Sequence, residues 1–129
     1  MMVDASRRLL DQRLRNRIME ELFGLAEWQE SLRTVGFAEY FESYFDWAPY
    51  DGEPYSNGVM TEGEREALRQ VQRIMIEAMN ATPNEMNVEQ FVATDWPQRI
   101  GRAAEEALRL MLRRGRFSEE AEESEPSRR

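Results

Sequence analysis

The side chains that this chain offers for chemistry are carboxylates, hydroxyls and guanidinium groups. Its 129 residues include no histidine and no cysteine, and all 17 basic residues are arginines. Histidine is the usual proton shuttle near neutral pH, while cysteine and lysine supply thiolate nucleophiles and Schiff bases. Imidazole and thiolate are also the preferred ligands of several transition metals. We therefore expect no cofactor and no transition-metal centre.

Pairs of carboxylates are the remaining route to catalysis. Two acids in different environments can divide the roles of general acid and general base. The candidates are Asp46, Asp51 and Glu53, which lie in a stretch that also contains proline and glycine. The chain has 25 acidic residues, so neighbouring carboxylates are common, and no spacing places these three around a substrate. A carboxylate-based enzyme, or a protein that binds a hard cation, is therefore the alternative function.

The same stretch partly resembles a calcium-binding loop. The residues at the first, fifth, sixth and twelfth positions of such a loop would be Glu53, Asn57, Gly58 and Glu64. The third position normally supplies a short oxygen ligand, but Tyr55 occupies it. Thr61 and Glu64 also have the spacing of a helix capping box, which gives Glu64 a structural role. We therefore expect no metal site.

Residues 34–64 combine acidity with aromatic side chains. They contain seven acidic residues, no arginine and all four tyrosines of the chain. Exposed aromatic rings beside carboxylates can bind cations through charge pairing and cation–π contacts. The sequence therefore predicts a surface for a basic protein or peptide. The candidate binding residues are Tyr40, Tyr44, Asp46, Trp47, Tyr50, Asp51, Glu53 and Tyr55.

A second interpretation of these aromatic residues is structural. Steps of three and four place Phe37, Tyr40, Phe41, Tyr44 and Phe45 on one face of a helix. Such a face commonly packs against the core of a helical protein. Both interpretations, an exposed binding surface and a buried face, stay open at this point.

Charge and hydropathy exclude several classes of function. The net charge is −8, whereas affinity for nucleic acid comes mainly from neutralising phosphates with cationic side chains. We expect no nucleic-acid binding. No secretory signal and no membrane anchor is visible, and the absence of cysteine is compatible with a reducing compartment. The expectation is a cytoplasmic protein without membrane contact.

Hydrophobic periodicity predicts helices throughout the ordered part of the chain. Apolar steps of three and four from Leu10 to Leu32 predict a long first helix over about residues 6–33, in which Gly24 is an interruption. Further helices are expected over about 62–81 and 97–114, with a short one opened by Asn87 and Gln90. An irregular loop containing proline and glycine joins the first helices to the rest.

These elements predict an all-α fold, a compact bundle of four or five helices in a single domain of residues 1–117. Residues 118–129 contain five acids and no apolar side chain larger than alanine, so a disordered acidic tail is expected. A first helix of about 42 Å would exceed the size of a small domain. Both a monomer and a homodimer therefore remain open.

The function expected from these features is non-catalytic. We expect an interaction module, such as an adaptor, a regulator or an inhibitor-like protein, that presents an acidic and aromatic surface to a basic partner.

Overall fold

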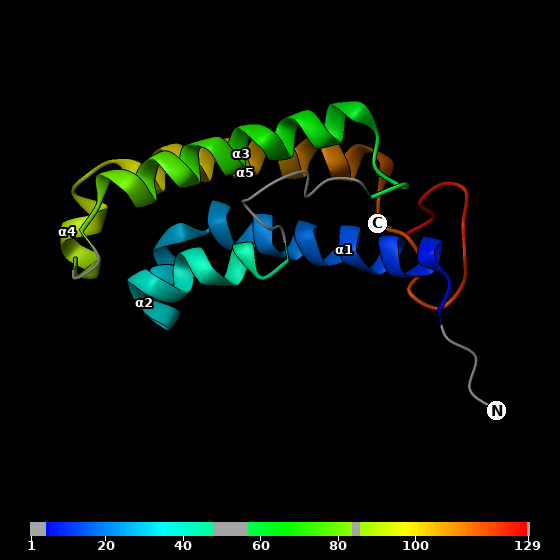
Figure 1. The fold of residues 1–129 in the computed structure, drawn as a ribbon, viewed down its shortest axis with the longest axis horizontal. Helices are drawn as coiled ribbons and strands as arrows, with labels where there is room; N and C mark the ends of the chain where they lie inside the picture. The colour runs from blue at the N-terminus through cyan, green and yellow to red at the C-terminus, as the bar shows by residue number, and fades with distance from the viewer. Residues whose placement is uncertain (1–4, 48–56, 84–85, 129) are drawn as a thin grey trace.

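The fold is a bundle of helices, as the periodicity predicted. The computed structural model describes residues 5–47, 57–83 and 86–128, and within these ranges the chain forms five helices and no strand (Figure 1). They are α1 (Arg7–Ala26), α2 (Trp28–Phe45), α3 (Glu62–Ala81), α4 (Val88–Val92) and α5 (Trp96–Arg114). Within these ranges, no helix is both long and apolar enough to cross a lipid bilayer.

The central element of the bundle is α5, which contacts all four other helices. In Figure 1, α3 and α5 lie side by side, and α1 with α2 forms the second layer. The apolar stripe of α5 faces this core, and Ile100, Ala104 and Met111 are completely buried. Gly101 lies on the same face, where Trp28 approaches it closely. The stripe of α5 therefore holds the two layers together.

Local sequence signals determine two of the helix starts. At the start of α3, the Thr61 side chain accepts from the Glu64 amide, and the Glu64 side chain accepts from the Thr61 amide. Asn87 and Gln90 form the same reciprocal pair at the start of α4. Both capping boxes confirm predictions from the sequence, because each needs only residues three positions apart.

The predicted long first helix is wrong. The chain leaves helical geometry at Glu27, with φ −91° and ψ 49°, so that α1 ends at Ala26 and α2 begins at Trp28. The Ser31 hydroxyl donates to the Gly24 carbonyl across this corner at 2.6 Å. The corner replaces one long helix by two shorter ones packed against each other. It also removes the length argument for completing the bundle between two chains.

A second bend lies inside α2. Gly36 has φ 85° and ψ 179°, a conformation that is essentially restricted to glycine. The residues after Gly36 run back along α1, so that Ser43 reaches Glu21. This bend brings Tyr40, Phe41 and Tyr44 into the core, where each is at most 5% exposed.

A buried ion pair between Arg15, near the middle of α1, and Glu64, at the start of α3, connects both layers. Arg15 is 0% exposed and Glu64 is 1% exposed. Two nitrogens of Arg15 donate to the two carboxylate oxygens of Glu64, at 3.2 and 2.7 Å. Arg15 also donates to the carbonyls of Met111 and Gly115, at 3.0 and 2.7 Å. One guanidinium therefore joins α1 to the start of α3 and to the end of α5.

The prediction of a disordered acidic tail is also wrong. Residues up to 128 are ordered against the first half of α1, and Phe117 is only 1% exposed. The Gln12 side chain donates to the carbonyls of Ser118 and Ala121, both at 2.9 Å. Asn16 exchanges two hydrogen bonds with the backbone of Phe117. Polar side chains of α1, rather than apolar burial by the tail itself, hold this segment in place.

Hydrogen bonds within the tail add to this order. The Glu123 carboxylate accepts from Ser127 and from the Ser118 amide, and these bonds lower the pKa of Glu123 below its usual range. The Glu123 amide donates to Gln12 at 2.8 Å. The acidic residues of the tail are thus partly engaged in local structure.

We predict that Glu64→Gln lowers the free energy of unfolding by about 3–5 kcal/mol, because it leaves the buried Arg15 without its counter-charge. The measurement is urea denaturation at neutral pH. The control is Glu66→Gln, which removes an exposed partner of Arg69 and is expected to cost less than about 1 kcal/mol. Similar losses in both variants would contradict the role assigned to burial.

A second prediction concerns the crossing of α5 and the α1–α2 corner. A Cβ atom at Gly101 would lie 2.8 Å from Trp28 Cδ1 and 3.3 Å from the Leu25 carbonyl oxygen. Gly101→Ala should therefore destabilise the fold by about 1–3 kcal/mol, despite the better helix propensity of alanine. In Gly63→Ala the nearest atoms lie 3.9 Å away, so a gain of about 0.4–1 kcal/mol is expected. Thermal and urea denaturation of both variants check the opposite signs.

Candidate functional site

The predicted binding residues separate into three groups. Tyr40 and Tyr44 are only 3% and 1% exposed, so they belong to the core and offer almost no surface to a partner. Asp46 and Trp47 are exposed at the end of α2, with Trp47 41% exposed. The other four, Tyr50, Asp51, Glu53 and Tyr55, lie outside the described residues. Only the second group supports an exposed surface, because the helical face that carries both tyrosines packs inward.

The exposed Trp47 ring already has a cation on it. The Arg17 guanidinium lies 4.8 Å from the centre of the indole ring. Arg17 also pairs with Glu20 and Glu21 on its own helix. A basic partner that used Trp47 would therefore have to displace an internal arginine.

Two of the residues considered for calcium, Asn57 and Glu64, have structural partners, and Glu53 lies outside the described residues. The Asn57 side chain donates to the Asp11 carbonyl at 2.8 Å and accepts from the Val59 amide. Glu64 is bound by Arg15 and by Arg114. The described residues contain no group of three or more acidic side chains that could hold a metal ion. These oxygens are used to fix the loop before α3.

Among the three acids of the enzyme alternative, Asp46 is the one that the structure describes. It is exposed at the end of α2. Asp51 and Glu53 lie outside the described residues. An exposed carboxylate does not provide the water-excluded environment that divides acid and base roles between two groups.

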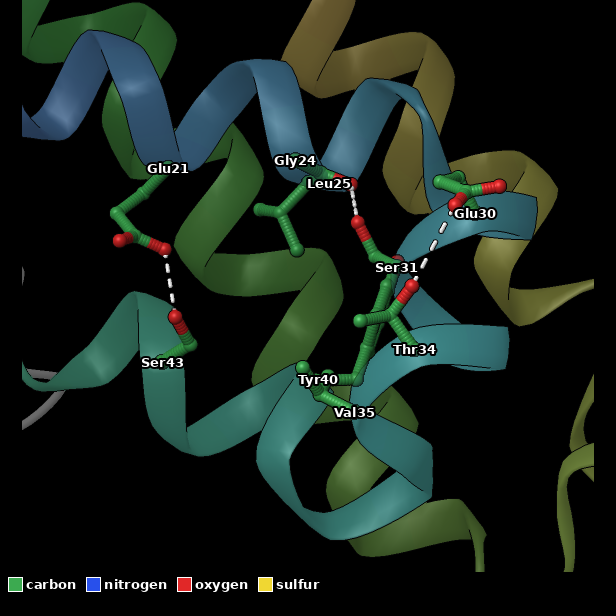
Figure 2. A pocket seen from close by; sticks show the side chains of 9 residues that line it. All are labelled: Glu21, Gly24, Leu25, Glu30, Ser31, Thr34, Val35, Tyr40 and Ser43. Carbon is green, nitrogen blue, oxygen red and sulfur yellow. Dashed lines mark hydrogen bonds between the residues drawn. The ribbon is translucent and has the colours of Figure 1, made fainter.

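A pocket of about 260 Å³ lies between α1 and α2. Its lining residues are Glu21, Gly24, Leu25, Glu30, Ser31, Thr34, Val35, Tyr40 and Ser43. The corner at Glu27 creates the pocket by folding α2 back along α1, and Gly36 divides the α2 side into two segments. In Figure 2, Glu21 and Ser43 lie on one side and Glu30, Ser31 and Thr34 on the other.

Polar contacts within and between the two helices fix the polar walls of this pocket. Ser43 donates to Glu21 at 2.8 Å, which ties the end of α2 to α1 (Figure 2). Glu21 also pairs with Arg17 at 3.1 Å. Thr34 lies 3.5 Å from Glu30 on the other side. No arginine lines the pocket, so its charged lining groups are both carboxylates.

Tyr40 differs from the other polar groups of the lining. Its ring packs edge-on against Phe41 and Phe91, with ring centres 5.4 and 5.6 Å away. Its hydroxyl is buried and has no hydrogen-bond partner among the described residues. Burial raises the pKa of Tyr40 well above its ordinary value, because the charged form would lose its hydration. The hydroxyl therefore stays neutral and offers one donor and two acceptor sites.

Acidic side chains continue beyond the pocket along residues 20–47, a segment that we call the α1–α2 corner. Residues 20–47 contain seven acidic residues and a single arginine, Arg33. Four of these acids, Glu27, Glu39, Glu42 and Asp46, have no ion pair within the described part of the chain. Exposed apolar side chains lie among them, with Phe23 57% and Val35 47% exposed. The corner thus combines unpaired negative charge with accessible apolar surface.

Sequence reasoning missed the pocket because it treated the first helix as continuous. On one straight helix, Glu21 and Glu30 would lie nine residues apart and could not face each other across α2. The available signals were Gly24 inside an apolar helix and the acids between residues 20 and 30. Both lie before residue 34, where the predicted acidic and aromatic segment begins.

Comparison with family models, with curated proteins and with solved structures found no match to this chain, so no function is transferred to it by similarity.

We predict that Tyr40→Phe raises the free energy of unfolding by about 1–2 kcal/mol, because it removes a buried hydroxyl without a partner. The variant should also lose less stability at alkaline pH. The folded state holds Tyr40 neutral, so the wild type loses stability as the pH rises above about 10, where the unfolded tyrosine ionises.

Urea denaturation at neutral and alkaline pH measures both effects. The control is Tyr44→Phe: Tyr44 is equally buried but is not without a partner, so no such gain is expected from it. A loss of stability in Tyr40→Phe would show that the hydroxyl is satisfied in solution.

Proposed function

We propose that this protein is a non-catalytic interaction module, an adaptor, regulator or inhibitor-like protein, that binds a basic protein or peptide. The binding surface is the α1–α2 corner, residues 20–47. The observation that carries the proposal is the excess of acids on this corner, where seven acidic residues accompany one arginine. Complementary charge of this kind accelerates association and selects the partner.

The contrast with α3 supports this assignment. On α3, Glu62 and Glu66 pair with Arg69, and the hydrogen bond from Arg69 lowers the pKa of Glu62. Acids that are paired within the molecule have little free charge for a partner. On the corner, by contrast, Glu39, Glu42 and Asp46 keep their charge available.

The apolar side chains of the corner supply the second component of an interface. Phe23 and Val35 are 57% and 47% exposed. Binding energy at protein interfaces is concentrated in apolar and aromatic groups that become desolvated, while charges at the rim govern rate and selectivity. The corner offers both kinds of group within two consecutive helices.

The alternative of a carboxylate-based enzyme or a hard-cation site has less support. It depends on Asp46, Asp51 and Glu53, and the one described member, Asp46, is exposed on the same acidic surface. The net charge of −8 also favours a basic partner over nucleic acid.

The test is binding of a fluorescein-labelled peptide of alternating arginine and glycine, followed by fluorescence anisotropy. We expect affinity to fall strongly when ionic strength rises from about 0.01 M to about 1 M, because the screening length shortens from about 30 to about 3 Å. The variant Glu39→Gln/Glu42→Gln/Asp46→Asn should bind about tenfold more weakly, with each charge contributing about 0.5 kcal/mol.

The matched control is Glu77→Gln/Glu89→Gln/Glu106→Gln, which makes the same change in net charge at exposed acids on α3, α4 and α5. It should retain most of the affinity. Equal losses in both variants would mean that only the net charge attracts the peptide, and the corner would not be the binding surface.

A further inference from the structure

We propose that a second pocket, between α2 and the end of α3, receives one apolar side chain of the basic partner, next to a basic residue that pairs with Glu42. This inference rests on the proposed function and names the group that anchors the partner. It is carried by an apolar lining that solvent reaches and by an exposed carboxylate that has no ion pair within the described residues.

The second pocket has the size and the lining of a site for one side chain. Its volume is about 300 Å³, the lower limit of the roughly 300–1,000 Å³ that is usual for ligand pockets. It lies at the end of the bundle next to α4 (Figure 1). Four of its six lining residues are apolar, and the full set is Phe37, Ala38, Phe41, Glu42, Met79 and Thr82.

Part of this apolar lining is accessible from solution. Met79 is 38% exposed, Ala38 is exposed and Phe37 is half-buried. A methionine side chain is unbranched and flexible, so it adapts to the shape of an apolar partner. Covering these groups would remove apolar surface from water, which favours binding.

The inner part of the pocket is held in place by the core. Phe41 is only 5% exposed, and the rings of Phe37 and Phe41 lie 4.9 and 5.5 Å from the ring of Phe91. The Thr82 hydroxyl donates to the Ala78 carbonyl at 2.8 Å. These contacts fix the pocket before a partner arrives, so that little ordering is needed on binding.

The charges around the pocket favour a basic residue beside the apolar one. Glu42 and Glu39, one turn earlier on α2, are exposed and have no ion pair within the described part of the chain. The C-terminal end of a helix carries partial negative charge, and the last turn of α3 contains no basic residue. Among the described residues, no arginine lines the pocket. A cation held next to Glu42 therefore meets no internal competitor.

The same charges disfavour a second copy of this chain as the occupant. The net charge is −8, so two copies repel each other. A basic partner reverses the sign of this interaction while it supplies the apolar side chain.

The experiment uses two derivatives of the labelled arginine–glycine peptide, with leucine or alanine in place of its central glycine. We expect the leucine peptide to bind about tenfold more tightly in fluorescence anisotropy, because its side chain becomes buried. Both affinities should fall between about 0.01 M and about 0.1 M salt, but their ratio should persist, since salt does not screen apolar burial. Equal affinities of the two peptides would overturn the inference.

A variant at the exposed methionine locates the leucine. Met79→Gln should reduce the advantage of the leucine peptide to about twofold or less, because it makes this part of the lining polar. The matched control is Leu112→Gln on α5, where Leu112 is 42% exposed and lines no part of the pocket. It should keep the full advantage. Equal effects of the two substitutions would overturn the inference.

A variant at the carboxylate tests the neighbouring basic residue. Glu42→Gln should weaken binding of the leucine peptide several-fold, because the peptide loses the charge next to its anchor. The matched control is Glu106→Gln, an exposed acid on α5, which should have a smaller effect. Equal losses in these two variants would contradict the pairing with Glu42.

Sedimentation velocity of the free chain tests the other occupant. We expect a monomer for the wild type and for Met79→Gln. A wild-type dimer that Met79→Gln dissociates would place a second copy in the pocket and overturn the inference.

The peptides also separate this inference from the proposed function. If the arginine–glycine peptide binds through the acids of the corner and leucine adds nothing, the interaction surface is supported and the apolar anchor is rejected. If the arginine–glycine peptide does not bind, while the leucine peptide binds and depends on Met79 and Glu42, the anchor is supported. The acidic corner is then rejected as a binding surface in its own right.

Discussion

The buried ion pair of Arg15 and Glu64 is the constraint on which the arrangement of this bundle depends. A guanidinium and a carboxylate removed from water are costly unless each finds several partners. Arg15 meets this condition by bonding both Glu64 oxygens and two carbonyls at the end of α5. The bond to Gly115 satisfies a carbonyl at the helix end, and the Met111 carbonyl accepts from the Gly115 amide as well. The pair thus fixes α1, α3 and α5 relative to one another, and the helical cap of α3 shares the same carboxylate.

This constraint divides α1 into two parts with different tasks. The first half carries the polar side chains that order the C-terminal segment, among them Gln12 and Asn16. The second half contributes Glu21, Gly24 and Leu25 to the pocket. Because the first half is held by many specific bonds, the second half has a fixed position from which α2 can turn back. Helix α1 therefore carries both the hydrogen bonds that order the C-terminal segment and one wall of the pocket.

The sequence predicted those features that depend on neighbouring residues. The capping boxes at Thr61 and Asn87 need only a spacing of three, and the apolar stripe of α5 needs only its own periodicity. The corner at Glu27 could not be predicted in this way, because the apolar spacing continues across it and the break is stabilised by packing with α5. The order of the tail was missed because its partners, such as Gln12, lie more than 100 residues away.

For the candidate site, the exposure of Asp46 and Trp47 was predictable from the sequence. The inward position of Tyr40 and the contact of Glu21 with Ser43 were not, because both depend on the bends in the chain.

The conformation of Gly36 controls the shape of the pocket between α1 and α2. The α2 wall of the pocket consists of two helical segments that meet at Gly36. The segment before Gly36 contributes Glu30, Ser31, Thr34 and Val35, and the segment after it contributes Tyr40 and Ser43. Gly36 itself lines no part of the pocket. Its φ and ψ angles nevertheless set the angle between the two helical segments. The shape of the pocket therefore depends on a residue that lines no part of it, and at this position the backbone conformation rather than the available space restricts which side chain is tolerated.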